Sequence, residues 1–277
     1  MPGIISVFKE CIDIAKKNYL RLIGLYILIV VIFTALTFLA VLLSLGAVLG
    51  VVSGISSPMA FVPLVLIVFI AAILISPVWN GIYYSLALQT MKKKSKPTLG
   101  KAFNDSKKVY RKMLWTSVIQ TVIMCIVLGI IMIPVLLYVF SPASTSSAAA
   151  SQPLLSLSAL AIGVVVALIV VAFILGVLFF VAVPLAMLDG SSGMAAIKKS
   201  INMAKRHGWS ILGLLILAFL AYVVAYVITD IFAFGFSAVN PLLGGVVSFI
   251  LTVLIESFVV GVVNFLPIVF YKRFVKS

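Results

Sequence analysis

The chain alternates between long, uncharged apolar runs and short basic stretches. Each apolar run has the roughly 20 residues that an α-helix needs to cross a bilayer. The composition agrees, because 64% of the residues are hydrophobic and 9% are charged, whereas soluble domains carry roughly 25% charged residues. A chain with so little polar surface cannot cover a soluble core, so the sequence predicts an all-α integral membrane protein.

Six crossings are predicted, over residues 20–48, 60–88, 113–140, 154–188, 209–234 and 245–270. All 20 Lys and Arg residues lie before or just inside the first run, between runs two and three, between runs four and five, or after the last. Because basic residues are retained on the cytoplasmic side, we predict a plasma-membrane protein with both termini in the cytoplasm. The net charge of +14 follows this topology and needs no nucleic-acid partner.

A basic amphipathic helix is predicted three times along the chain. In residues 193–214, GMAAIKKSINMAKRHGWSILGL, apolar side chains recur at spacings of four, three and four, and the basic residues fall on the opposite face. Residues 4–25 repeat this stretch without a gap, and residues 98–119 repeat it more weakly, with Trp115 at the position of Trp209. The period predicts one membrane domain, 1–277, built from units 1–97, 98–192 and 193–277. Each unit is a cytoplasmic surface helix followed by a helical hairpin.

The basic residues of these surface helices are the predicted contacts to lipid headgroups. A basic amphipathic helix lies in the membrane interface and is attracted by anionic lipids. The residues concerned are Lys16, Lys17, Lys107, Lys108, Arg111, Lys112, Lys198, Lys199, Lys205 and Arg206. The alternative is that these residues act only as orientation signals.

Two stretches between crossings are predicted to be flexible outer loops. Gly46, Gly50 and Gly54 precede serines and a proline, although their GxxxGxxxG spacing also suits close contact between two membrane helices. Residues 141–152 are small, polar and uncharged, as in a flexible linker.

Four polar residues within the apolar runs are candidates for an intramembrane site. Glu256 lies near the middle of the last run, where an ionisable group is costly unless it is paired, neutral or hydrated. Gln120 and Asn264 are its candidate hydrogen-bond partners, and Asp230 is expected at the outer interface. Glu256 either binds a proton, a cation or a substrate amine, or forms a structural hydrogen bond to a neighbouring helix as a protonated carboxyl.

The sequence lacks the usual signatures of enzymes and of metal sites. It has no glycine-rich phosphate loop and no histidine pair at metal-ligand spacing, because His207 is the only histidine. Cys11 and Cys125 are too few and too far apart for a metal cage or a disulfide framework. We therefore predict a protein without catalytic residues, metal or cofactor.

Residues 183–217, VPLAMLDGSSGMAAIKKSINMAKRHGWSILGLLIL, combine a proline near the end of a crossing, an Ala-x-x-x-Ser sequence, a basic pair and a new apolar run. This combination resembles the six-helix membrane domain attached to some prokaryotic glycerophosphodiester phosphodiesterases, and its stand-alone relatives of unknown function. The resemblance extends over nearly the whole chain and implies an architecture, not an activity. The phosphodiesterase part of such proteins is a separate barrel with catalytic His and Glu residues, which has no counterpart in this chain.

Two functions from different classes are consistent with these features. The first is a non-enzymatic membrane module that engages anionic lipid and acts as a scaffold or accessory for a membrane partner. The second is a small secondary transporter or channel with Glu256 at its centre. Many transporters are built from two halves, so three units with the same orientation favour the first.

Overall fold

The computed structural model describes residues 3–52, 62–92, 97–139 and 153–275, and these contain helices and turns but no strand. Five helical segments of this part are long and apolar enough to cross a membrane. They are Tyr19–Phe38, Phe69–Met91, Leu99–Ile133, Gly193–Ala238 and Pro241–Phe274, and a shorter apolar helix is Gly163–Phe179. The all-helical prediction is confirmed, and the five segments indicate a membrane protein.

Helices account for most of the described residues. In order they are α1 (Ile4–Lys17), α2 (Tyr19–Val52), α3 (Val62–Met91), α4 (Leu99–Val139), α5 (Pro153–Phe179), α6 (Leu185–Leu188), α7 (Gly193–Val239), α8 (Pro241–Leu251), the π-helical turn η4 (Thr252–Glu256) and α9 (Ser257–Phe274). The first turns of α4 and α7 belong to the predicted surface helices, and the remainder of each belongs to a predicted crossing.

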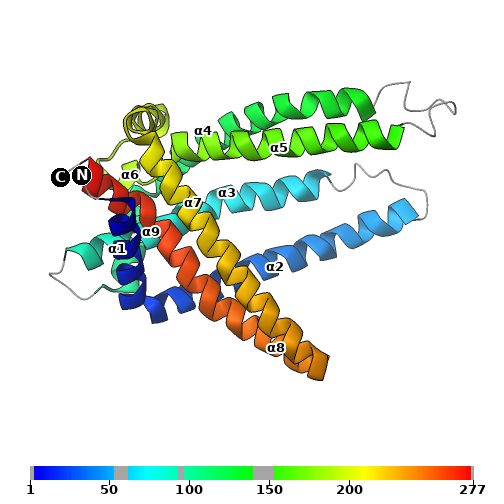
Figure 1. Ribbon diagram of the computed structural model, residues 1–277, viewed down its shortest axis with the longest axis horizontal. Coiled ribbons are helices and arrows are strands. Elements are labelled where there is room, and N and C mark those ends of the chain that lie inside the picture. The colour runs from blue at the N-terminus through cyan, green and yellow to red at the C-terminus, as the bar shows by residue number, and fades with distance from the viewer. Residues whose placement is uncertain (1–2, 53–61, 93–96, 140–152, 276–277) are drawn as a thin grey trace.

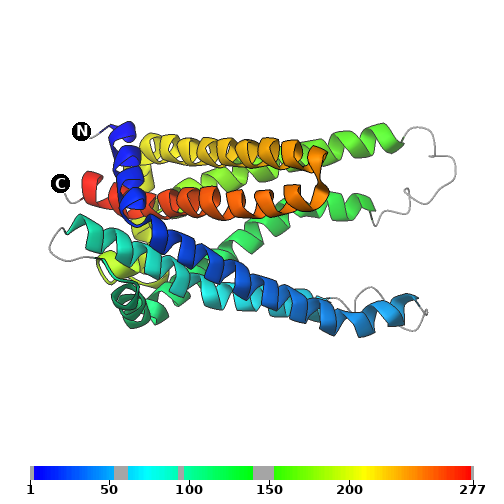
Figure 2. The same cartoon turned by 90° about the horizontal axis from the view of Figure 1, so that it is seen from below.

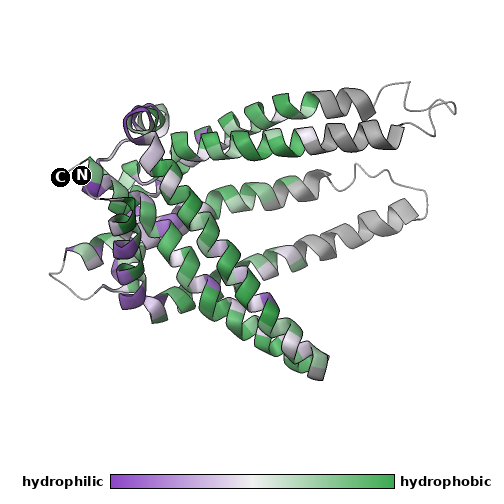
Figure 3. Ribbon diagram, in the orientation of Figure 1, coloured by the Kyte–Doolittle hydropathy of each residue, from purple (hydrophilic) through white to green (hydrophobic). Residues whose placement is uncertain are grey.

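The long helices diverge from one end of the molecule (Figure 1). At this end, which we call the basic end, lie α1, α6, the first turns of α4 and α7, the last turns of α3 and α9, and both chain termini. Three antiparallel pairs extend from it, namely α2 with α3, α4 with α5, and α7 with α8 and α9, as a perpendicular view also shows (Figure 2). Hydrophilic residues gather at the basic end, whereas apolar residues cover the long helices (Figure 3).

The packed core lies at the basic end. Its buried side chains come from helices far apart in the sequence and include Leu22, Tyr83, Met113, Leu185 and Phe270. Farther out, the same long helices expose many large apolar side chains. In a bilayer such faces contact lipid tails, which are as apolar as leucine. The outer parts of the hairpins therefore need little contact with one another.

The first and third surface helices are separated from their crossings by a break in the backbone. Asn18 lies between α1 and α2 with φ −111° and ψ 9°, and His207 interrupts α7 with φ −129° and ψ 22°. These residues are 189 positions apart, which is the offset between the first and third predicted repeats. The Asn18 side chain donates to Thr90 Oγ1 (2.9 Å), and the His207 ring packs edge-on against Phe270 and Phe274. In contrast, α4 continues from its basic half into its apolar half as one helix.

A small buried residue lies where each surface helix packs on a crossing. Ser106 Oγ of α4 donates to the Val78 carbonyl of α3 (2.9 Å), and Ser200 Oγ of α7 donates to the Leu178 carbonyl of α5 (2.8 Å). Cys11 is at the aligned position of α1, which packs against α9. All three side chains are fully buried.

The fourth predicted crossing, 154–188, is not one continuous helix. α5 ends at Phe179, and a turn over residues 180–184 leads into the short α6. Pro184 has no N–H to bond to the Phe180 carbonyl four residues earlier. The Ala182 N–H bonds to the Phe179 carbonyl (3.0 Å), and the Leu178 carbonyl accepts from Ser200 instead. The sequence-based prediction is wrong at this end because the bond that replaces the helical one comes from another helix.

The first predicted outer loop begins later in the chain than expected. Gly46 and Gly50 lie within α2, which extends to Val52, because a glycine costs only about 1 kcal/mol in a helix. Gly54 and residues 141–152 lie outside the described residues. The connection between the last two crossings is shorter than expected, since α7 ends at Val239 and α8 begins at Pro241. Asn240 caps α8 by accepting from the backbone N–H groups of the second and third residues that follow it (2.9 and 3.3 Å).

Candidate functional site

All ten predicted headgroup residues are exposed. They lie on α1 and on the basic halves of α4 and α7, at the basic end of the molecule. Lys199 pairs with Asp189, in the turn that precedes α7. Lys108 lines one hollow, Lys205 and Arg206 line a second, and Lys16 lines a third. The cations of the three surface helices thus lie beside different cavities.

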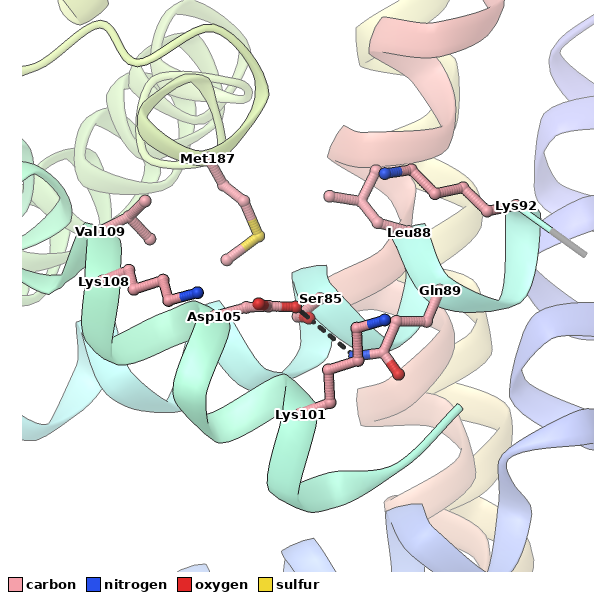
Figure 4. A pocket seen from close by; sticks show the side chains of 9 residues that line it. All are labelled: Ser85, Leu88, Gln89, Lys92, Lys101, Asp105, Lys108, Val109 and Met187. Carbon is pink, nitrogen blue, oxygen red and sulfur yellow. Dashed lines mark hydrogen bonds between the residues drawn. The ribbon is translucent and has the colours of Figure 1, made fainter. Parts of the chain in front are cut away.

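The most polar of these hollows is a cavity of about 730 Å³ between the last turns of α3 and the first turns of α4, with α6 on its third side. α3 contributes Ser85, Leu88 and Gln89, and Lys92 directly follows it; α4 contributes Lys101, Asp105, Lys108 and Val109; and α6 contributes Met187. The three lysines stand around the opening, and Asp105 lies between Lys101 and Lys108 on the same helix (Figure 4). We call this hollow the lysine cavity.

A chain of hydrogen bonds fixes the polar wall of the lysine cavity. Gln89 Nε2 donates to Ser85 Oγ (3.1 Å), and Ser85 Oγ donates to Asp105 Oδ2 (2.8 Å). Gln89 Oε1 also accepts from the backbone N–H of Thr98, just before α4 (3.0 Å). Ser85 and Gln89 are almost fully buried. The carboxylate is therefore held by a rigid wall, and the same bonds tie the start of α4 to α3.

The lysines of the cavity are not neutralised by ion pairs. Among the described residues, the salt bridges are those of Lys199 with Asp189 and of Arg273 with Glu10. Lys92, Lys101 and Lys108 are exposed and lie outside both pairs. Three ammonium groups beside one carboxylate make a positively charged hollow. Such a hollow suits a phosphate or another anion that accepts several hydrogen bonds.

Sequence reasoning identified Lys108 but missed the other polar residues of the cavity. A signal for them exists, because Ser85, Gln89 and Lys92 follow one another at spacings of four and three, as do Lys101, Asp105 and Lys108. Residues at these spacings share one face of a helix. Two polar stripes on consecutive helices indicate that the stripes face each other.

Glu256 hydrogen-bonds to a tyrosine that no sequence pattern indicated. Tyr26 of α2 donates from its hydroxyl to Glu256 Oε2 (2.5 Å). Glu256 is half-buried and ends the π-helical turn η4. A π-helical turn holds one residue more than an α-helical turn, and such turns are frequent at functional sites. The extra residue rotates Glu256 relative to the residues that precede the turn.

The other candidate intramembrane residues do not gather around Glu256. Asn264 Nδ2 donates to the Val260 carbonyl of its own helix (2.8 Å). Gln120 Oε1 is buried and has no hydrogen-bond partner among the described residues. Asp230 is exposed on α7. The structure therefore brings together Glu256 and Tyr26, and it leaves the other three in separate surroundings.

Comparisons with family models, with curated proteins and with solved structures found no match to this chain. The functional argument therefore rests on the residues of the chain itself. Within the described ranges, no group of three or more His, Cys, Asp or Glu side chains could hold a metal ion. The absence of enzymatic activity stays a prediction.

A second hollow, of about 620 Å³, lies between α5 and the break in α7. Its wall on α5 is apolar and includes Ile169, Phe173 and Ile174, whereas α7 contributes Lys205 and Arg206 together with Trp209. Trp209 is 86% exposed, which suits a Trp at the membrane interface. We call this hollow the apolar groove. It has cations at one end and hydrocarbon along its length.

Two titratable groups at the basic end are shifted by their surroundings. Burial raises the pKa of the Asp189 carboxyl, but the hydrogen bonds from Lys199 and Ser191 outweigh burial and lower that pKa overall. The hydrogen bond to Asp189 in turn raises the pKa of Lys199. Burial and the nearby charge of Glu10 raise the pKa of the Cys11 thiol. Cys11 is therefore an inert packing residue, because the thiolate is the reactive form.

Proposed function

We propose that this chain is a non-enzymatic, multi-pass protein of the plasma membrane that binds anionic lipids at its cytoplasmic face. In this role it serves as a scaffold or accessory module for a membrane partner. The six-helix membrane domains that its sequence resembles provide the architecture of the proposal. The observation that carries it is the lysine cavity, in which three lysines outside the ion pairs of the described residues surround one hollow at the basic end. Basic pockets at the cytoplasmic ends of membrane helices are typical binding places for anionic headgroups.

The proposal includes six crossings arranged as three units, 1–97, 98–192 and 193–277. The apolar helix α5, Pro153–Phe179, supports a sixth crossing beside the five long segments. Similar surroundings at aligned positions support the three units. The positions are Cys11, Ser106 and Ser200, which are fully buried, and Leu20, Trp115 and Trp209, which are exposed where each surface helix meets its crossing.

The proposed orientation places the basic end in the cytoplasm. The exposed basic residues of α1, α4 and α7 support it, because Lys and Arg are retained on that side. In a background without Cys11 and Cys125, a single cysteine at Ser146 should react with an impermeant thiol reagent outside intact cells, and one at Ser95 should not. Labelling at Ser95 without permeabilisation contradicts the orientation. Both positions lie outside the described residues.

Lipid binding is tested on the purified chain in mild detergent. Added phosphatidylglycerol should raise the melting temperature more than phosphatidylcholine does, and the difference should shrink at high salt, because charges near the surface are screened within about 8 Å at physiological salt. Replacing Lys107, Lys108 and Lys112 by Gln should lower both the co-purified anionic lipid and this difference, since each basic residue contributes on the order of 1 kcal/mol near an anionic surface. The matched control replaces the same lysines by Arg. Equal stabilisation by both lipids in the parent chain contradicts the proposal.

A second candidate function is a small transporter or channel, and the Tyr26–Glu256 pair favours it. An ionisable residue inside the membrane, bonded to another helix at a π-helical turn, is a typical place for proton or cation binding. Glu256→Gln keeps the shape and the hydrogen-bond acceptor but removes the titratable group. If the residue transports a proton, this variant should abolish pH-driven flux in proteoliposomes, while Asn264→Gln leaves the flux intact. The absence of flux in the parent chain rules this function out.

A further inference from the structure

The lysine cavity contains a carboxylate that simple anion binding does not need. Asp105 lies on the same face of α4 as Lys101 and Lys108, yet it forms no ion pair among the described residues. It is instead held by Ser85, which is itself held by Gln89. The carboxylate is thus oriented by neutral groups, and the lysines remain available to a ligand.

The geometry leaves one carboxylate oxygen available for a ligand. Ser85 donates to Oδ2 of Asp105, and no donor among the described residues reaches Oδ1. An ionised carboxylate is an acceptor only, with room for several hydrogen bonds. Ionised phosphate oxygens carry no proton to donate to it, and their negative charge is repelled by it. A hydroxyl group can donate to it.

The lysines and Asp105 together therefore favour a ligand that carries both an anionic group and a hydrogen-bond donor. The lysines attract a phosphate, and Asp105 accepts a hydrogen bond from a group close to that phosphate. Leu88, Val109 and Met187 add an apolar side to the same cavity, which suits the carbon atoms of the ligand. A bare phosphate uses the lysines alone and meets the carboxylate as a repulsive neighbour.

We propose that the lysine cavity binds a phosphate ester that carries free hydroxyl groups. Lys92, Lys101 and Lys108 hold the phosphate, and a ligand hydroxyl donates to Asp105. The proposal rests on the proposed lipid function and adds the headgroup chemistry of the site. The same chemistry occurs in a phosphatidylglycerol headgroup and in soluble glycerol 1-phosphate, so both are used as probes.

The experiment measures binding to the full chain in mild detergent by native mass spectrometry. The probes are phosphatidylglycerol, phosphatidic acid, which lacks the headgroup hydroxyls, and glycerol 1-phosphate. Asp105→Asn removes the charge and keeps an oxygen that accepts from Ser85, so the variant should fold. The ratio of phosphatidylglycerol affinity to phosphatidic acid affinity should fall about tenfold in this variant, as expected for one hydrogen bond to a charged group. Asp13→Asn, at an exposed acid of α1, is the matched control and should leave the ratio unchanged.

The lysines are tested separately. Lys92→Gln with Lys101→Gln should weaken binding of both lipids and of glycerol 1-phosphate by about tenfold or more, because two charge-assisted contacts are lost. Lys9→Gln removes an exposed cation of α1 that lies outside the cavity and outside the predicted headgroup contacts, and it should change binding less than threefold, as expected for a screened surface charge. Tighter binding of phosphatidylglycerol than of glycerol 1-phosphate assigns the site to a lipid, and the reverse assigns it to a soluble ester.

Two results overturn the inference. One is an Asp105→Asn variant with the same affinity ratio as the parent chain. The other is a variant with Lys92→Gln and Lys101→Gln that binds the probes as tightly as the Lys9→Gln variant does. In either case, continued stabilisation of the chain by anionic lipid leaves the proposed function in place. Loss of that stabilisation in the parent chain removes the proposed function itself, so the two failures are distinguishable.

Discussion

The basic halves of α4 and α7 begin from similar sequences and form different hollows. In α4, Lys101 and Lys108 face polar side chains of α3 across the lysine cavity. In α7, Lys205 and Arg206 stand at the end of the apolar groove, whose α5 wall is hydrocarbon. The difference comes from the crossing against which each surface helix packs. Two similar sequences thus place cations at the start of each helix, whereas the facing helix determines whether polar or apolar side chains lie beside them.

The acids near the two surface helices differ in the same way. Asp189, before α7, is paired with Lys199, whereas Asp105, within α4, accepts from Ser85. The ion pair at α7 neutralises the charge of Lys199, whereas the hydrogen bond from Ser85 to Asp105 neutralises no lysine. The α4 region therefore keeps more unpaired charge beside its hollow.

The largest expected effect comes from the packing beneath the two surface helices. A Cβ on Gly81 of α3 would collide with the Ser106 side chain of α4, whereas a Cβ on Gly176 of α5 would lie 3.5 Å from Leu215 Cδ1, an ordinary contact. Gly81→Ala should lower the free energy of unfolding by about 1–3 kcal/mol, the usual cost of overpacking. Gly176→Ala should change it by less than about 1 kcal/mol, because alanine is the better helix former. Denaturation in mixed micelles measures both, and equal losses contradict the difference in packing.

An intermediate effect is expected from the cations of the apolar groove. Lys205→Gln with Arg206→Gln should lower the stabilisation by anionic lipid by roughly 1 kcal/mol for each charge. The loss should be the same for phosphatidylglycerol and for phosphatidic acid, because the groove offers no acceptor like Asp105. Melting temperatures with each lipid test this, and Lys205→Arg is the control that keeps the charge. If only the stabilisation by phosphatidylglycerol is lost, the apolar groove also distinguishes the two headgroups. The proposed difference between the two hollows is then wrong.

The smallest effect is expected from the Asp189–Lys199 pair. The pKa of Asp189 is lowered in the folded chain, so the pair stabilises the fold above the unfolded pKa of about 3.9. This stability is lost as the pH falls through the lower, folded pKa. The pair is partly exposed, so Asp189→Asn should cost less than about 1 kcal/mol at pH 7. The melting temperature of this variant should also fall less between pH 4 and lower pH than that of the parent chain. An equal fall in both proteins contradicts the pairing.

Much of the fold was accessible from the sequence because lysine and arginine are excluded from hydrocarbon. This exclusion located the basic stretches and the apolar helices between them. It did not locate the end of α5, because the carbonyl freed at Leu178 is satisfied by Ser200 of another helix. It also did not locate the short turn at Asn240, which depends on a side-chain cap.

The candidate site was predictable in part. The spacing of Ser85, Gln89 and Lys92 marks a polar face at the end of an apolar helix. The partner of Glu256 was not predictable, because Tyr26 is 230 positions away and meets it only where α2 crosses the last helices. The π-helical turn before Ser257 has no local sequence signal that we recognise. Contacts that depend on how two long helices cross are the part that hydropathy and spacing cannot supply.

The divergence of the three hairpins from the basic end has a mechanical consequence (Figure 1). The molecule is narrow and closed at the basic end and broad and open at the other, so it occupies unequal areas in the two leaflets. In a bilayer, the apolar side chains exposed on the outer parts of the hairpins would contact lipid tails. A protein of this shape acts as a wedge in the bilayer. The elastic energy of the surrounding bilayer then depends on how the membrane is curved. We expect the protein to concentrate where the membrane curves toward its narrow end.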